Sequence, residues 1–500
     1  MKLSTLKVSL LFGIFAVVPL LGQQSNPFEK FGSKVPVQVA VGTSTKKMEL
    51  IKIDPRLGKI YCNLVGVGQV NYELSLLGEP GQPKGFQYTW PKDVVQALSL
   101  AADEQYHRIP DTFIAQKMKP VMYPMLHYLE MPNRFFNIHE QCLTYVKLLI
   151  AKENYGDALI ILNSINLNAL EKAGYREFAN MALGLIAKVI TASLGARYED
   201  FALKLFTKIN LRANNGNDHE VCLRLGDSLR ENAQKATRER KKITHPSNLG
   251  GRRRVLTSAD EIKKAQILLS REIKQYDSAN KVYNRLSTII APLPNSPIKE
   301  RARLWPIYCY YNLYGAYDEY AAVDPSKAKS KNALAWKARG KNYRTNADSF
   351  LSEIDKKPPA RLSNEYSLYK LLRANKSTIY GNGYSTVALT VEGQKAKDYQ
   401  TKAVQYYNEA VTEVTEGIVS SRVGLAWLPE ALLIAASGYE NLSKSAASSA
   451  KDSPTEKEQK AKEQKAHKEA AQNIYRQMQV FYKGQEWANI ATNKLGSSGP

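Results

Sequence analysis

The stretch FANMALGLIAKVI, residues 178–190, decides the fold class of this chain. Its apolar side chains recur three and four positions apart, the spacing that places them on one face of an α-helix. They are Phe178, Met181, Ala182, Leu185, Ile186, Val189 and Ile190. A helix with so wide an apolar stripe has to bury it, so the stretch predicts a helix that packs against other helices.

A finer pattern recurs along the chain. An Ala is followed four residues later by a large apolar or aromatic residue, and three residues after that by another apolar one. The five copies are Ala158/Leu162/Ile165, Ala202/Phe206/Ile209, Ala279/Tyr283/Leu286, Ala403/Tyr407/Ala410 and Ala471/Tyr475/Met478. A small residue on a helix face allows a neighbouring helix to approach closely, and the larger residues fill the space on either side.

In this pattern the sequence resembles tetratricopeptide repeats, in which the second helix of each pair begins with a small residue followed by aromatics. Cys222, Leu225, Gly226 and Leu229 resemble the first helix of such a pair. The spacing between the copies is irregular. The resemblance implies a mainly α fold, an α-solenoid of irregular helix pairs over residues 91–243 and 258–500.

A small β unit is expected before the helices, over residues 35–90. Val35, Val37, Val39 and Val41 alternate with other residues, and the same period of two continues toward Tyr72 and Leu74. Four or five short strands of this kind predict a small sheet or barrel. After Pro91, a residue suited to the first turn of a helix, the period changes to that of helices.

The N-terminus has the layout of a secretory signal peptide over residues 1–22, followed by a linker over residues 23–34. Lys2 and Lys7 precede an apolar run, and Gly22 offers a small residue for cleavage before Gln23. The run is short for a membrane span, although an uncleaved anchor is the alternative. We therefore expect an exported protein, either periplasmic, extracellular or associated with the envelope, with no transmembrane segment after cleavage.

Composition excludes several protein classes. The 500 residues are 44% apolar and 23% charged, which argues against a mostly disordered chain and against a polytopic membrane protein. Four Cys cannot form a disulfide-rich scaffold; one or two bridges or buried free thiols both remain open. The net charge of +23 predicts attraction to anionic partners, although a highly soluble surface is an equally plain explanation.

Two stretches have a biased composition. A basic loop is expected over residues 244–257, and a Lys/Glu/Ala-rich insert near residues 443–468. The loop and the residues before it contribute six candidate polyanion-binding residues. These are Arg240, Lys241, Lys242, Arg252, Arg253 and Arg254.

One predicted helix is crowded with aromatic residues. The candidate groove aromatics are Trp305, Tyr310, Tyr314 and Tyr317. Tyr310, Tyr314 and Tyr317 share a helix face, and a tyrosine ring with its hydroxyl suits peptide or glycan recognition. The alternative is that these residues fill gaps between helices.

No spacing of residues predicts catalysis, a metal or a cofactor. His139-Glu140 lacks the second His of a zinc protease helix, and no nucleotide-binding loop follows Gly66. Asp218, His219, Glu220 and Cys222 form a dense cluster of ligand types, yet a solvated helix cap beside a polar loop is the favoured explanation. We therefore expect no enzyme.

These observations lead to one functional hypothesis and one alternative. Secreted bacterial proteins with degenerate repeats after a small β module generally act as envelope scaffolds, so the resemblance implies a scaffold that binds another envelope protein through a groove. The alternative is binding of an anionic glycan or envelope polymer through a basic, Tyr-rich surface. Nucleic acid is not expected, because no nucleic-acid-binding motif accompanies the Arg runs.

Overall fold

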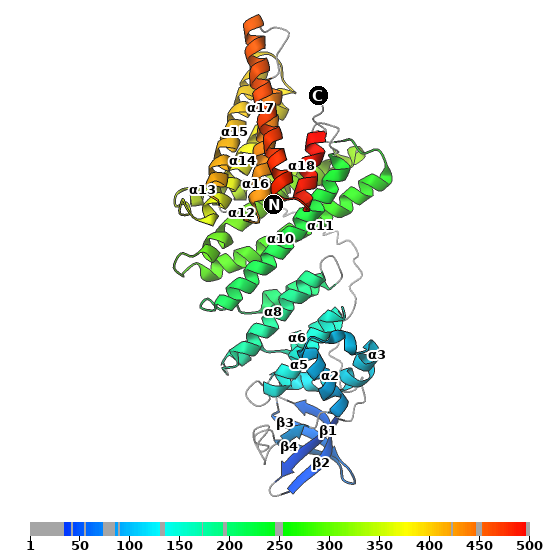
Figure 1. Ribbon diagram of the computed structural model, residues 1–500. Helices are drawn as coiled ribbons and strands as arrows, with labels where there is room; N and C mark the ends of the chain where they lie inside the picture. Colours follow the sequence, from blue (N-terminus) through cyan, green and yellow to red (C-terminus); the bar gives the residue numbers. More distant parts are fainter. Residues whose placement is uncertain are drawn as a thin grey trace, which may run out of the picture. The chain divides into compact units, whose positions relative to one another are not determined.

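The computed structural model describes residues 35–41, 44–54, 57–73, 86–88, 91–130, 136–172, 174–193, 198–245, 254–421, 424–446 and 453–496. The predicted signal peptide and linker, residues 1–34, lie outside the described residues. The chain divides into two compact units, Met1–Ile186 and Ala187–Pro500, which are described in turn. Figure 1 draws the strands in blue and the helices of the second unit from green to red.

The first unit begins with a five-stranded antiparallel sheet, which confirms the expected small β unit. The strands are β1 (Val35–Val41), β2 (Ser44–Asp54), β3 (Lys59–Leu64), β4 (Gly68–Glu73) and β5 (Phe86–Tyr88), in the order β4-β3-β2-β1-β5. Met48, Ile60 and Cys62 are buried in it. Gly66 and Gly68 have φ values of 83° and 93°, which suit glycine in the turn that joins β3 to β4. The described strands form an open sheet with β4 and β5 at its edges.

Helices complete the first unit. They are α2 (Lys92–Ala102), η2 (Tyr106–Arg108), α3 (Asp111–Phe113), η3 (Ile114–Met118), α4 (Lys119–Met122), η4 (Tyr123–Glu130), α5 (Phe136–Ala151), α6 (Tyr155–Ser164), α7 (Leu167–Lys172) and the first part of α8 (Arg176–Ala192), which continues past Ile186 into the second unit. The change to helix occurs directly after Pro91, as predicted, and α5 packs against both α2 and α6. The stretch 178–190 lies within α8, where Ala182, Ile186 and Val189 are buried.

The second unit consists of helices. They are α9 (Glu199–Lys208), α10 (Gly216–Thr244), α11 (Ala259–Ile290), α12 (Pro297–Ala322), η6 (Pro325–Lys327), α13 (Lys331–Asp355), α14 (Asn364–Ala388), α15 (Gly393–Val419), α16 (Leu428–Ser445), α17 (Pro454–Phe481) and α18 (Glu486–Gly496). Consecutive helices pack as pairs, α10 with α11, α12 with α13, α14 with α15 and α16 with α17. The first helices of the pairs also contact one another in order, which makes the unit a solenoid-like array.

The alanine signatures occupy the contacts between helices. All five Ala residues are buried, and the residue four positions later is at most 3% exposed in each copy. A Cβ on Gly226 of α10 would lie 2.5 Å from Cε1 of Tyr283 on α11, and one on Gly381 of α14 would lie 2.7 Å from Cε1 of Tyr407 on α15. The small residue of one helix therefore receives the aromatic ring of its partner, as the resemblance implies.

The paired helices α10 and α11 of the second unit are longer than those of tetratricopeptide repeats. In that family one repeat of two helices has about 34 residues. Here α10 alone has 29 residues and α11 has 32. This pair is thus nearly twice the length of one such repeat, whereas α6 and α9, which carry two of the five alanine signatures, have 10 residues each.

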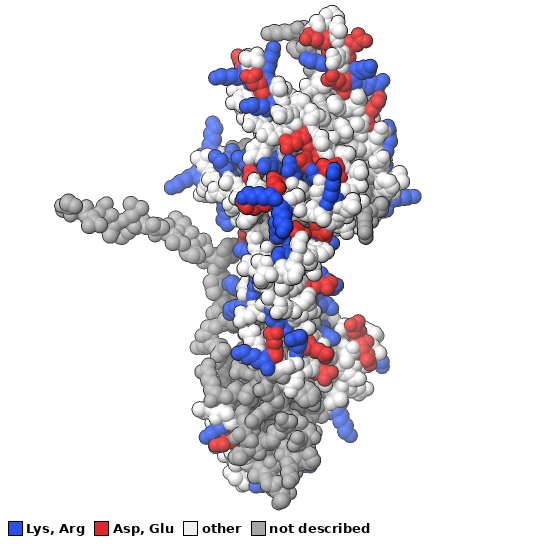
Figure 2. All heavy atoms as spheres, turned by 90° about the vertical axis from the view of Figure 1, so that its left-hand side faces the viewer, with Lys and Arg blue, Asp and Glu red and all other residues white. Residues whose placement is uncertain are grey.

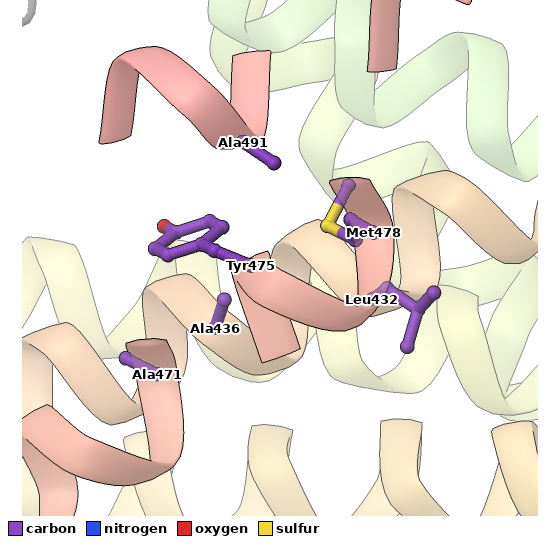
Figure 3. Packing of buried hydrophobic residues seen from close by; sticks show 6 residues of the cluster. All are labelled: Leu432, Ala436, Ala471, Tyr475, Met478 and Ala491. Carbon is purple, nitrogen blue, oxygen red and sulfur yellow. The ribbon is translucent and has the colours of Figure 1, made fainter. Parts of the chain in front are cut away.

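The array ends with a small helix that covers the last pair. Figure 3 shows Ala491 of α18 facing Tyr475 and Met478 of α17, with Leu432 and Ala436 of α16 on the other side of α17. Trp487 and Leu495 of α18 pack against the same cluster. Terminal repeats need such a cap, because otherwise their apolar face would be exposed to water. No described helix is long and apolar enough to cross a bilayer.

Candidate interaction surface

The predicted polyanion-binding residues do not form a single exposed patch. Arg240 is buried, and its guanidinium pairs with Glu272 at 2.8 Å and with Glu319. A buried Arg needs such carboxylates to offset its desolvation, so Arg240 holds α10, α11 and α12 together and is not available to a ligand. Its assignment as a surface residue is wrong, because position 240 falls on the buried face of α10.

The other members of that set have different surroundings. Lys241 and Lys242 are exposed, and Lys242 lies 3.6 Å from Glu486 of α18. Arg254 pairs with Glu261 at 3.1 Å. Arg252 and Arg253 lie outside the described residues. Figure 2 shows Lys and Arg interspersed with Asp and Glu on the face that it draws, so charge sign alone does not mark a binding site there.

Trp305, predicted to line a groove, is buried in the array. The Arg230 guanidinium lies 4.0 Å from its ring centroid, and the Trp427 ring lies edge-on at 5.8 Å. Arg and Trp stack well because the ring face is negative. The assignment of Trp305 to a groove is therefore wrong, because its ring is enclosed by side chains from α10 and the start of α16.

Tyr310 and Tyr317 are also buried, at 9% and 6% exposure. Both rings pack on Tyr343 of α13, each with 5.7 Å between centroids, and Tyr310 stacks on Phe350 as well. For these two residues the alternative explanation, filling gaps between helices, is the one that the structure supports. Of the four candidate groove aromatics, only Tyr314 is partly exposed.

Tyrosine hydroxyls join neighbouring helices through carboxylates. Tyr283 donates to Asp227 at 2.6 Å, and Tyr475 donates to Glu440 at 2.9 Å. Further bonds of this kind are Tyr308 to Glu430, Tyr311 and Tyr380 to Asp348, Tyr366 to Glu416 and Tyr369 to Asp355. A buried hydroxyl requires a partner, and an ionised acceptor makes the bond stronger. This accounts for much of the excess of Tyr, 29 residues against 13 Phe.

A set of partly exposed tyrosines remains, together with two cations that contact their rings. We name this set the tyrosine surface. It consists of Tyr314, Arg344, Tyr380, Tyr384, Tyr399, Lys402 and Tyr406, from the four helices α12 to α15. The Arg344 guanidinium lies 5.3 Å from the Tyr314 ring and 5.5 Å from the Tyr380 ring, so it bridges two helix pairs.

The rings of the tyrosine surface stack on one another. Tyr406 lies 5.5 Å from both Tyr380 and Tyr384, and Tyr384 lies 6.1 Å from Tyr399. Lys402 covers the Tyr384 ring at 5.7 Å. Because the faces of Tyr384 and Tyr406 are occupied by neighbouring rings and by Lys402, the edges and hydroxyls of these two residues are the groups left for a ligand.

Four of these hydroxyls are potential donors. Those of Tyr314, Tyr384, Tyr399 and Tyr406 have no hydrogen-bond partner among the described residues, whereas Tyr380 donates to Asp348 at 2.8 Å. Burial raises the pKa of Tyr406, and burial with the Asp348 carboxylate raises the pKa of Tyr380 to about 12. The Tyr406 phenol therefore stays protonated near neutral pH and can donate to a carbonyl or carboxylate oxygen.

The sequence cluster around His219 has a structural explanation. Asp218 accepts hydrogen bonds from Arg212 and Asn215 at the start of α10, which fixes the helix N-terminus. In the part of the chain that the structure describes, no three His, Cys, Asp or Glu side chains gather as metal ligands. The four cysteines are free and buried.

Two surface cavities lie beside α11. One, of about 580 Å³, is lined by Lys242, Ile243, Lys263, Lys264 and Ile267 with two carboxylates, Glu239 and Asp260. The other, of about 410 Å³, lies against α9 and contains the ion pairs of Lys274 with Asp200 and of Lys281 with Asp277. Neither lining combines a nucleophilic side chain with a histidine base.

The sequence was compared with known protein families and with curated proteins. No known protein family matches the chain, and no curated protein sequence matches it either. The fold defines its class, a mainly helical, solenoid-like array of helix pairs with a small sheet before it.

The sequence reasoning missed most of the tyrosine surface. It singled out Tyr314, but Tyr380, Tyr384, Tyr399 and Tyr406 are spread over two helices and become neighbours only when α14 packs on α15. It also missed further copies of the alanine signature; one of them, Ala347/Leu351/Ile354 on α13, has all three residues buried. The same spacing search with Leu in the second position, already used for Ala158, would have found it.

Proposed function

We propose that this protein is a non-enzymatic, exported scaffold that binds a protein partner through the tyrosine surface. The observation that carries the proposal is the continuous row of partly exposed Tyr rings with Arg344 across two helix pairs. Tyr and Arg are the residue types that dominate the binding energy of protein interfaces. The resemblance to secreted repeat proteins favours an envelope protein as the partner.

The geometry also favours a peptide over a sugar ring as the ligand of this surface. Stacking on a sugar needs a free aromatic face, and here the faces of Tyr384 and Tyr406 are covered by each other. The hydroxyls of these partly exposed residues instead suit the carbonyl and carboxylate oxygens that a polypeptide offers in large number. The rings are held in place by packing, so little conformational freedom is lost on binding.

Site-specific photocrosslinking in the native cells tests the proposal. Tyr399 is replaced by the photoreactive p-benzoylphenylalanine, and the control carries the same replacement at Phe481 of α17, an aromatic residue that is 67% exposed and outside the tyrosine surface. We expect one discrete adduct from position 399 and none from position 481. No adduct from position 399, or the same adducts from both positions, would refute the assignment.

Export is tested separately. If residues 1–22 are a cleaved signal peptide, N-terminal sequencing of the chain recovered from the cell envelope should begin at Gln23. A chain that starts at Met1 and is recovered from the cytoplasm would remove the export part of the proposal and leave the binding part to the crosslinking result.

A further inference from the structure

The beginning of α13 and the turn before it form the most one-sided charged segment that the structure describes. Between residues 325 and 347 there are seven basic residues and no acidic one. They are Lys327, Lys329, Lys331, Lys337, Arg339, Lys341 and Arg344. We name residues 327–344 the basic segment. It is separate from the basic loop, residues 244–257, that the sequence pattern emphasised.

The basic segment is accessible and largely uncompensated. Every one of its cations except the partly buried Arg344 is exposed. Lys327 pairs with Asp324 at 3.4 Å, while the other six make no ion pair with a described carboxylate. Two carboxylates lie nearby: that of the exposed Asp318 on α12, whose backbone nitrogen lies near Gly340, and that of Asp277 on α11, which interacts with Arg339. The local excess of positive charge is therefore large.

The position of these cations on the helix is unfavourable for stability. Positive side chains at a helix N-terminus oppose the helix dipole, and α13 has no acidic residue in its first turn. Lys337 and Lys341 are one turn apart, where like charges also repel. A segment that accumulates this repulsion gains from an anionic ligand, which relieves the repulsion on binding.

The residue types favour a particular class of anion. Five of the seven cations are Lys, which acts as a point charge without the planar geometry of Arg, and Lys is depleted in protein interfaces. Lys337 and Lys341 share one face of α13, and Lys331 lies about a third of a turn around the helix from Lys337, so the three spread positive charge over about 15 Å at 1.5 Å per residue. Positive charge spread over such a length suits a linear polyanion better than a folded protein partner.

We propose that the basic segment binds an anionic polysaccharide. This site is distinct from the tyrosine surface. Arg344 is the one residue that belongs to both sets. The choice of a polysaccharide over a nucleic acid rests on the export part of the proposed function. The binding itself does not depend on the protein partner.

The test is titration of the purified full chain with heparin, a sulfated polysaccharide. The variant is Lys331→Gln, Lys337→Gln and Lys341→Gln together. The matched control is Lys457→Gln, Lys462→Gln and Lys468→Gln, three exposed lysines of α17 that alternate with glutamates. Both triple variants lose the same net charge, so a difference between them reports the site and not the total charge.

We expect heparin to bind the unaltered chain and the control alike, and the α13 variant about ten-fold more weakly. The slope of log Kd against log salt should fall by about one for each contact removed. The melting temperature of the α13 variant should stay equal or rise, because Lys331 opposes the helix dipole and Lys337 and Lys341 repel each other, so weaker binding cannot be ascribed to unfolding.

Three results would overturn the proposal. The two triple variants could bind heparin with equally reduced affinity, or both could bind it as tightly as the unaltered chain. Either result would show that the basic segment is not the binding site. Polyglutamate or single-stranded DNA could bind more tightly than heparin with the same dependence on α13, and that result removes the polysaccharide as the ligand. Crosslinking from position 399 is independent of all three, so a failure here is distinguishable from failure of the proposed function.

Discussion

At the scale of single residues, the array is specified by small side chains that accept aromatic rings from the neighbouring helix. Gly226 and Tyr283 are the clearest example, because the ring lies where the Cβ of any other residue would be. The Tyr283 hydroxyl also donates to Asp227, the residue after the glycine. One contact thus combines close packing with a fixed hydrogen bond, and two substitutions test it.

Gly226→Ala should lower the free energy of unfolding by about 1 to 3 kcal/mol, because the new methyl group displaces the Tyr283 ring. Gly315→Ala is the control. No atom lies within 4 Å of the Cβ that it would add in α12, so better helix propensity should stabilise that variant by up to about 1 kcal/mol. Denaturant unfolding measures both. Stabilisation by Gly226→Ala would contradict the packing described here.

Ala279→Leu tests the signature itself. Ala279 is fully buried on α11, which packs against α10 and α12. The larger side chain should therefore overpack the helix contact and lower the free energy of unfolding by about 1 to 3 kcal/mol. Ala466→Leu on the exposed side of α17 is the control and should leave thermal unfolding unchanged. If both variants unfold like the unaltered chain, Ala279 is not a packing position.

At the scale of helices, each pair is joined by buried or partly buried polar contacts as well as by apolar packing. In the pair α14 and α15, Lys370 contacts Glu413 at 2.6 Å and Glu416 at 2.9 Å. Tyr366 donates to Glu416 at 2.6 Å. Hydrogen bonds from Tyr366 and Lys370 lower the pKa of Glu416 from 4.5 to about 2.

This depressed pKa makes the pair sensitive to acid. A carboxylate whose pKa is lower in the folded state contributes stability above its unfolded pKa, and the contribution disappears as the pH falls toward the folded value. The melting temperature of Glu416→Gln should therefore lie below that of the unaltered chain at pH 6, and the difference should shrink between pH 4.5 and about 2. Glu353→Gln, which removes an exposed pair with Lys356, should show no such trend. A difference that is constant with pH would contradict the argument.

The sequence predicted the helices and their contacts better than the residues at the surface. Helix periodicity and the alanine spacing depend on residues close in the chain, so they were readable in advance. The predicted exposure of Arg240 and Trp305 was wrong because the residue type alone does not tell whether a charged or aromatic side chain lies on a buried or an exposed helix face. The neighbours Glu272 and Trp427, which decide their burial, are 32 and more than 100 positions away. The tyrosine surface was not predicted for the same reason, because its residues come from helices that are distant in sequence.

At the scale of the whole second unit, the array departs from a simple chain of neighbours. In most repeat proteins each repeat contacts only the next one. Here Gln234 of α10 donates to Glu430 of α16 at 3.2 Å, and Arg238 of α10 pairs with Glu486 of α18 at 2.8 Å. The first and last helix pairs are therefore joined directly, which should make unfolding of residues 187–500 more cooperative than that of an open array.

A double variant tests this coupling. Gln234→Ala with Arg238→Ala should speed hydrogen exchange in α16 and α18 while α13, which contacts neither residue, keeps its protection. Arg224→Ala, which removes an exposed pair with Glu220 within α10, is the control and should change neither region. Equal protection of α18 in both variants would show that the contacts between the ends of the array carry no coupling.

The four buried thiols make the folding of this chain measurable without any added label. Cys62, Cys142, Cys222 and Cys309 stand in β3, α5, α10 and α12, one in each of four elements spread over both units. Burial raises the pKa of all four, so a thiol reagent can modify each only while its own element is open. Mass spectrometry of the modified peptides would then give the rate of modification of each thiol, and so the rates at which four separate elements open, in a single reaction.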